Sequence, residues 1–269
     1  MRPEAAPPVG RAGAPLLALE GVGKSFGDMS VVERLDVVVE RGAFVAIVGP
    51  SGAGKTTILN LIAGLDAPST GTVRLNGRPV TGPDPSVGFM LQKDLLLPWR
   101  TVVANVEFGL EARRVPVARR RERALVELKR CRLEDFAGHL PRQLSGGMRQ
   151  RAALARTLAI DPELILLDEP FSALDAQTKL ILQKGFARTI AESGITTVLI
   201  SHDLQEAVCM ADRIVVLSER PGRVLETIDL DREAGLPGRD DPLARRLHPR
   251  ANEVVAHLFA LLRLDERSA

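Results

Sequence analysis

The run Gly49-Pro50-Ser51-Gly52-Ala53-Gly54-Lys55-Thr56 matches every fixed position of the pattern G-x-x-x-x-G-K-[ST]. Directly before it, residues 43–48 form an unbroken apolar stretch of the kind that a buried parallel strand shows. A helical pattern follows in residues 58–63 and stops at Gly64, a residue type favoured at helix C-termini. A strand, a glycine-rich loop and a helix therefore follow one another in the order of a phosphate-binding loop.

A loop of this kind binds phosphates mainly through its backbone. Its N–H groups and those of the following helix N-terminus point at the β- and γ-phosphates, where the helix dipole favours negative charge. Lys55 adds a positive charge, the Thr56 hydroxyl can ligate Mg²⁺, and Thr57 continues the helix start. A glycine-rich turn with an unrelated lysine is the alternative, but it leaves the flanking strand and helix unexplained. We predict that residues 49–57 bind a nucleoside triphosphate and that Lys55 also acts in catalysis.

The composition of the chain excludes several classes of protein. Its 269 residues are 45% hydrophobic and 26% charged, as in globular proteins, and the net charge of +2 gives no basic field for nucleic acid. No apolar stretch reaches the roughly 18 residues that span a bilayer. Residues 1–15 lack the layout of a signal peptide, and we expect a flexible tail there. Cys131 and Cys209 fit neither a disulfide framework nor a metal cluster, and helical spacing predicts that Cys209 is a packed thiol.

The pattern of strands and helices predicts an α/β fold. Valine-rich residues 31–39 and a segment with an Asn76-Gly77 turn, residues 73–80, are typical of antiparallel strands. Helical stretches separate three further apolar strands, as in a parallel sheet covered on both faces; these strands are residues 164–167, 196–200 and 214–217. Between about residues 93 and 160 the pattern is helical, which predicts an inserted subdomain with helices at 101–110, 119–129 and 148–159. Residues 226–269 form a C-terminal extension with a short helix at 254–264.

Within the helical region, residues 113–132 contain nine basic residues and two acidic ones. A solvated helix face explains this charge run, and contact with acidic lipid head groups or an acidic partner is the alternative. Aromatic residues do not interleave with the basic ones, so a nucleic-acid stacking surface is not expected.

A second candidate catalytic segment is Leu164-Ile165-Leu166-Leu167-Asp168-Glu169. Four apolar residues predict a buried strand, and the two carboxylates come at its C-terminal end, where ligands bind in open α/β sheets. Asp168 is placed to hold Mg²⁺, and Glu169 is placed to act as general base on the attacking water. An isolated Asp-Glu pair is usually only a turn, so the prediction depends on the phosphate-binding loop of the same sheet.

A third segment, Leu144-Ser145-Gly146-Gly147-Met148, identifies a family. Ser145, Gly146 and Gly147 open a predicted helix, so that bare N–H groups and a hydroxyl can bind an anion. The chain resembles the ATP-binding cassette (ABC) ATPases, whose signature has this Leu-Ser-Gly-Gly core. The resemblance implies a P-loop NTPase (RecA-like) core with an N-terminal antiparallel β subdomain. It also implies ATP and Mg²⁺ as cofactors and a head-to-tail dimer, in which Ser145 of one subunit caps the γ-phosphate bound to the other.

The resemblance covers residues 16–225 and assigns further roles in chain order. It places Phe26 under the adenine, Gln92 beside Mg²⁺ and the attacking water, and His202 at the γ-phosphate. Residues 172–175 resemble the loop that communicates across the dimer, and Asp175 ends it. Met148 replaces the usual glutamine of the signature, and a thioether cannot reproduce the hydrogen bonds of an amide.

The segment Leu95-Leu96-Leu97-Pro98-Trp99 indicates the kind of transporter. An exposed apolar run beside Gln92 is unfavourable unless a partner protein buries it, and tryptophan is favoured at interface hot spots. A tryptophan in the core of the helical subdomain is the alternative. This segment and the signature ending in Met148 are similar to the corresponding segments of the nitrate, sulfonate and taurine importer group.

The resemblance to that importer group implies an ATP-hydrolysing subunit on the cytoplasmic face of the inner membrane. It would pair with a second, identical ATP-binding subunit and bind a permease through the Trp99 region. A solute-binding protein would act indirectly through the permease, and no nucleic acid would be a partner. An exporter or lipoprotein-release motor is the alternative within transport. Non-transport ABC ATPases fit this sequence less well, because they need coiled-coil arms or two cassettes in one chain, whereas this sequence has one phosphate loop and one signature.

Overall fold

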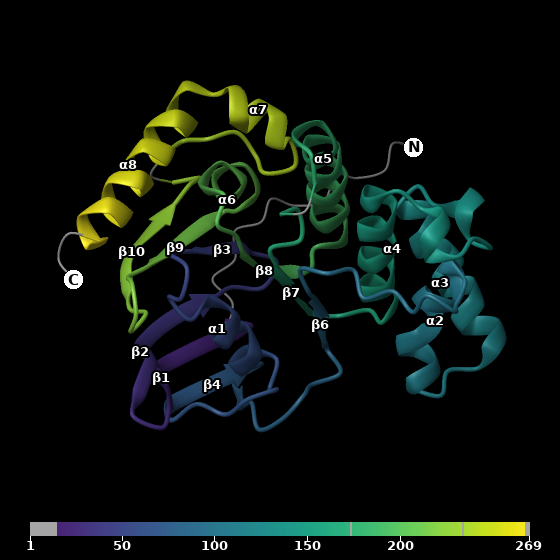
Figure 1. The fold of residues 1–269 in the computed structure, drawn as a ribbon, viewed down its shortest axis with the longest axis horizontal. Coiled ribbons are helices and arrows are strands. Elements are labelled where there is room, and N and C mark those ends of the chain that lie inside the picture. The colour runs from purple at the N-terminus through teal and green to yellow at the C-terminus, as the bar shows by residue number, and fades with distance from the viewer. Residues whose placement is uncertain (1–14, 173, 233, 267–269) are drawn as a thin grey trace, which may run out of the picture.

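The computed structural model describes residues 15–172, 174–232 and 234–266, and it contains two β-sheets with helices around them (Figure 1). The expected flexible tail lies outside the described residues, except for Pro15. One sheet has the strand order β2-β1-β4-β5 and the other has the order β10-β9-β3-β8-β7-β6. The predicted α/β class with a separate N-terminal sheet is confirmed.

The N-terminal sheet is antiparallel and packs on helix α1 (Lys55–Ile62). Its strands are β1 (Leu17–Phe26), β2 (Met29–Val39), β4 (Thr70–Leu75) and β5 (Arg78–Pro79). Asn76 and Gly77 both have positive φ and connect β4 to β5, which confirms the predicted hairpin turn. Apolar side chains of this sheet, of α1 and of one face of the central sheet form one buried cluster.

The central sheet carries the phosphate-binding loop. Its parallel strands are β3 (Phe44–Val48), β6 (Val87–Met90), β7 (Leu164–Asp168), β8 (Thr196–Ile200) and β9 (Arg213–Leu217). Every residue of β3, β7 and β8 is buried, as expected for strands covered on both faces. An antiparallel edge strand, β10 (Val224–Asp229), extends the sheet through the expected domain limit at residue 225.

The helical region forms one group at one end of the molecule, on the right in Figure 1. It contains α2 (Val102–Ala112), α3 (Val117–Arg130), two short 3-10 turns (Glu134–Phe136 and Pro141–Gln143) and α4 (Gly146–Ala159). Each helix includes nearly all of the expected range, and α4 begins two residues earlier than expected. Buried side chains of this group join those of the central sheet in a single apolar cluster.

The C-terminal segment adds β10 to the sheet beside β9, and its two helices pack on α5 (Ala176–Ser193) and α6 (Leu204–Met210). Helices α5 and α6 contribute to the same cluster, and α7 (Pro242–Leu247) and α8 (Pro249–Glu266) follow β10 (Figure 1). Arg245 of α7 is fully buried and donates to the carbonyls of Pro237 and Ala211 while pairing with Asp231. The expected helix at 254–264 lies inside α8. Among the helices of the described chain, none combines the length and apolarity that crossing a bilayer requires.

The prediction that Cys209 is a packed thiol is confirmed. Cys209 lies buried in α6, and burial raises the pKa of its thiol to about 11. Such a thiol stays protonated at neutral pH and is a poor nucleophile.

Candidate functional site

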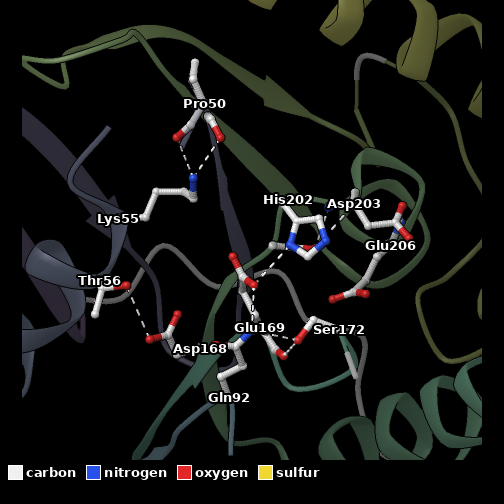
Figure 2. A network of polar contacts seen from close by, with 12 residues as sticks. Pro50, Lys55, Thr56, Gln92, Asp168, Glu169, Ser172, His202, Asp203 and Glu206 are labelled. Atoms are coloured by element: carbon white, nitrogen blue, oxygen red, sulfur yellow. Dashed lines mark hydrogen bonds and ion pairs between the residues drawn. The ribbon is translucent and has the colours of Figure 1, made fainter. Parts of the chain in front are cut away.

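The phosphate-binding loop connects β3 to α1 at the C-terminal edge of the central sheet. Gly52 and Gly54 have φ values of +85° and +84°, which only glycine adopts without strain. The buried Lys55 Nζ donates to the carbonyl oxygens of Gly49 and Pro50, at 2.8 and 2.7 Å (Figure 2). Burial lowers the pKa of Lys55, and the carboxylates of Glu169 and Asp168 act in the opposite direction. An anion in the loop would favour the charged ammonium further.

A pocket of about 420 Å³ lies beside this loop. Its volume falls within the range of small-molecule sites, and it is lined by Phe26, Met29, Val31, Ser51, Gly52, Gly54, Lys55, Thr56, Thr57, Glu169 and Arg220. The Phe26 ring is half exposed, and the Lys24 ammonium lies 4.8 Å from its centroid while paired with Asp66 at 2.6 Å. This cation–π contact holds the ring in place. The pocket therefore combines an aromatic platform with a phosphate cradle.

Asp168 is the last residue of β7 and faces the start of α1. The Thr56 hydroxyl donates to Asp168 Oδ2 at 3.4 Å (Figure 2). Burial raises the pKa of Asp168, and the neighbouring Glu169 adds to this effect. The described residues contain no cluster of three or more His, Cys, Asp or Glu that could hold a metal ion. A hydroxyl and a carboxylate nevertheless suit Mg²⁺, which takes its other ligands from phosphates and water.

Glu169 lies at the centre of a polar network (Figure 2). Its Oε2 is 3.1 Å from His202 Nδ1 and accepts a hydrogen bond from Gln92 Nε2 at 3.3 Å. Gln92 Nε2 also donates to Ser172 Oγ at 3.1 Å. The φ of Glu169 is +46°, an uncommon backbone conformation that turns the chain sharply at the end of β7. Of the three residues expected from the sequence to act in catalysis here, Gln92 and His202 thus each contact Glu169.

The segment after Gln92 is tied to the helical group. Gln150 Nε2 donates to the Gln92 carbonyl at 3.2 Å, and Arg149 pairs with Asp94 at 3.0 Å. Arg156 donates to the carbonyls of Asp94 and Leu95. All three donors belong to α4, the helix that begins at the signature. A movement of the helical group would therefore be transmitted to Gln92 and, through it, to Glu169.

A second polar network, which no sequence motif indicates, begins at Asp203, the residue after His202. Lys179 of α5 lies 2.7 Å from both Asp203 Oδ2 and Glu206 Oε2, and Gln183 donates to Glu206. Asp203 caps α6 by accepting from the Glu206 N–H at 3.1 Å. Burial raises the pKa of Glu206 and by itself would lower that of Lys179, but hydrogen bonds to the two carboxylates raise the latter. This ion cluster fixes the start of α6, and hence the loop of His202, on α5.

Lys179→Met is expected to destabilise the protein by about 3 kcal/mol, because it leaves the buried Glu206 carboxylate without its cation. Urea unfolding of the variant measures this loss. The double variant Lys179→Met/Glu206→Gln removes both charges and should recover much of the stability. Equal stability of Lys179→Met and the unchanged protein would mean that the cluster does not stabilise the fold.

The signature does not reach the pocket of its own chain. Ser145 Oγ caps α4 by accepting from the Met148 N–H at 3.3 Å. Neither Ser145, Gly146 nor Gly147 is among the described residues that line the pocket. Asp175 likewise caps a helix, α5, by accepting from the Thr178 N–H at 3.0 Å. These four predicted nucleotide-binding residues therefore lie apart from Lys55 and Phe26 within one chain.

Two open alternatives from the sequence can be compared with the structure. Trp99 is 74% exposed, so it is not a core residue of the helical group. Several arginines of residues 113–132 are engaged inside this group, since Arg120 and Arg121 contact Glu107 while Arg123 and Arg130 contact Glu127. Arg113 donates to the Ile160 carbonyl. These contacts favour the solvated, internally paired helix face over a lipid-binding surface.

Comparisons with known proteins agree with the site. The ABC transporter family model matches residues 32–172. The chain is 46% identical over 205 residues to the uncharacterized ABC transporter ATP-binding protein MJ0412 of Methanocaldococcus jannaschii, covering 76% of this chain and 77% of that protein. It is 44% identical over 216 residues to the taurine import ATP-binding protein TauB of Yersinia pestis, covering 80% and 85%.

A solved structure extends the comparison to the fold. The ATP-binding cassette MJ0796, in a dimeric post-hydrolysis state bound to ADP and Pi, is 34% identical to this chain. The TM-score is 0.68, and the match covers 80% of this chain and 98% of that one. With its phosphate loop, paired carboxylates and signature in the family's order, the chain belongs to the ATP-hydrolysing, ATP-binding subunits of ABC transporters.

Proposed function

We propose that this chain drives uptake of a small sulfonate-like solute by hydrolysing ATP at a site shared between two copies. The observation that carries this proposal is the position of Glu169, which contacts Gln92 and His202 beside a phosphate loop that lacks the signature of its own chain. The 44% sequence identity to a taurine import ATP-binding protein supports both the direction of transport and the class of solute.

The site residues fit ATP and Mg²⁺. Lys55 Nζ donates to two carbonyl oxygens and can turn to phosphate oxygens, and Phe26 offers a π face for the adenine. Thr56, Asp168 and Gln92 would hold Mg²⁺ through oxygen atoms. When bound, ATP supplies the bond that is cleaved and Mg²⁺ neutralises charge on its phosphates. Glu169 Oε2 then accepts the proton of the attacking water, and His202 and Gln92 hold that carboxylate in place.

A head-to-tail dimer completes this site. Ser145 Oγ and the N–H groups of Gly146 and Gly147 open α4, where the helix dipole favours an anion. Ser145, Gly146 and Gly147 do not line the pocket of their own chain, and we infer that they bind the phosphates held by another copy. The dimeric state of the ABC cassette MJ0796 supports this arrangement.

We further propose that the permease covers the exposed segment around Trp99. Leu91, Leu95 and Trp99 are large apolar side chains exposed within nine residues, directly beside Gln92. Arg156 and Arg149 of α4 hold this segment at Asp94 and Leu95. A permease seated there would therefore act on Gln92 and on the start of α4 together, which would place the chain at the membrane as a peripheral subunit.

Trp99→Ala is expected to weaken binding to the permease by tenfold or more, on the order of the loss at an interface hot spot. Because Trp99 is exposed, nucleotide binding and thermal unfolding should not change. Leu247→Ala, which truncates another highly exposed apolar side chain on α7, is the matched control. Co-purification with the permease measures the effect, and equal recovery of both variants would exclude Trp99 from the interface.

Reconstitution tests the proposed function directly. The chain, its permease and the associated solute-binding protein are placed in vesicles, and ATP hydrolysis is measured with taurine, alkanesulfonates or nitrate outside. We expect stimulation by a sulfonate together with its accumulation inside. If ATP hydrolysis were instead stimulated by a substrate on the side of the membrane that carries this chain, and that substrate were moved to the opposite side, the chain would belong to an exporter and the proposal would be contradicted.

A further inference from the structure

A second long basic side chain besides Lys55 lines the nucleotide pocket, and none of the predicted motifs includes it. Arg220 lies in the turn between β9 and β10, far along the chain from the phosphate loop. We propose that Arg220 is a nucleotide-binding residue whose guanidinium contacts the phosphate chain of bound ATP. This inference rests on the proposed nucleotide site and adds to it a residue that no sequence motif assigns.

The first support is the fixed position of the turn that carries Arg220. The Gly222 N–H donates to the Val31 carbonyl at 2.9 Å, and the Glu33 N–H donates to the Gly222 carbonyl at 3.0 Å. A Cβ at Gly222 would lie 2.2 Å from the Ala53 carbonyl oxygen, so the turn packs directly against the phosphate loop. Ser218 closes the turn by donating to the Arg223 carbonyl at 2.9 Å. The backbone therefore presents the Arg220 side chain at the loop.

The second support is where the guanidinium lies. Its Nη1 is 3.0 Å from Met29 Sδ, and its Nε is 3.4 Å from the Gly52 carbonyl oxygen. Met29 begins β2 just beyond Phe26, the aromatic platform, whereas Gly52 belongs to the phosphate cradle. Arg220 thus bridges the two parts of the pocket between which an ATP molecule would extend.

The third support is the weakness of these contacts. A thioether is a poor acceptor, and a single carbonyl at 3.4 Å is a long hydrogen bond. Within the described residues, no carboxylate forms an ion pair with Arg220. Its neighbour Arg223, in contrast, pairs with Glu33 at 2.7 Å. A guanidinium has five donors in a fork that matches phosphate oxygens, so an anionic ligand in the pocket would satisfy Arg220 far better.

Binding titrations of the purified chain with a fluorescent ATP analogue test the proposal. Arg220→Ala is expected to weaken binding about tenfold, the usual loss for a charge-assisted hydrogen bond. Arg220→Lys should recover part of this loss, because it keeps the charge without the fork. Raising the salt concentration should weaken binding by the unchanged protein more than binding by Arg220→Ala.

Arg223→Ala is the matched control, since it truncates an arginine of the same turn that points to Glu33. Its nucleotide affinity should equal that of the unchanged protein. Thermal unfolding of each variant checks that the turn remains folded, and Arg220→Gln serves as a second variant of similar length. If Arg220→Ala bound the ATP analogue as tightly as the unchanged protein, the inference would be overturned. Lys55→Ala is measured beside it, because loss of binding by that variant shows separately that the phosphate loop is the nucleotide site. An equal loss of affinity for adenosine would also overturn it, because the contact would then not involve phosphates.

Discussion

Glu169→Gln is expected to bind ATP as tightly as the unchanged protein and to hydrolyse it about 10² to 10⁴ times more slowly, the usual contribution of a general base. The substituted amide still has an oxygen that can accept from Gln92 and His202, so the network around position 169 should keep its geometry. The amide cannot take a proton from water, however. ATP should therefore remain bound between two copies, and the dimer should become stable enough to isolate.

Steady-state ATPase rates and size-exclusion chromatography with ATP measure these two effects. Glu163→Gln is the matched control, because Glu163 lies at the opposite end of β7 and forms an exposed pair with Arg41 at 2.9 Å. Exposed pairs of this kind contribute little, so its hydrolysis rate should not change. Near-normal turnover by Glu169→Gln within the transporter complex would refute the assignment of Glu169 as the base.

The central strands and the phosphate loop could be predicted because their signals are local. Residues 164–167 are continuously apolar, and Asp168 follows at the position where a parallel strand ends. The Asn76-Gly77 turn is similarly encoded in two adjacent residues. In such segments the sequence pattern and the observed element coincide, because backbone preference and burial favour the same structure.

Other parts could not be predicted because distant residues create them. Strand β10 mixes Glu226 and Asp229 with apolar residues, and it becomes a strand only through pairing with the edge of β9. Lys179 of α5 and Glu206 of α6 lie 27 positions apart along the chain and meet only through the tertiary fold, so neither residue carries a motif of its own. The contact of Arg220 with Met29 joins two residues that are 191 positions apart along the chain. The spacing of residues along the chain therefore does not predict these contacts.

Gly146→Asp and Lys55→Ala are each expected to abolish hydrolysis alone, and a mixture of the two variants should regain activity. In a head-to-tail dimer, a mixed pair has one site with an intact Lys55 and an intact signature, whereas its other site carries both defects. Random pairing makes half of the dimers mixed, so the mixture should recover about a quarter of the normal activity if the two sites work independently.

The structure favours Gly146 over Gly147 for this experiment. A Cβ at Gly146 would have its nearest neighbours at 3.8 and 3.9 Å, so the aspartate fits the fold and adds its charge where a phosphate would bind. At Gly147 the Cβ would lie 2.8 Å from Thr178, which would disturb α5. Gly146→Asp should bind ATP normally as a separate chain, whereas Lys55→Ala should not. Loss of ATP binding by the separate Gly146→Asp chain would mean that the signature acts on its own pocket, and recovery in the mixture would then not occur.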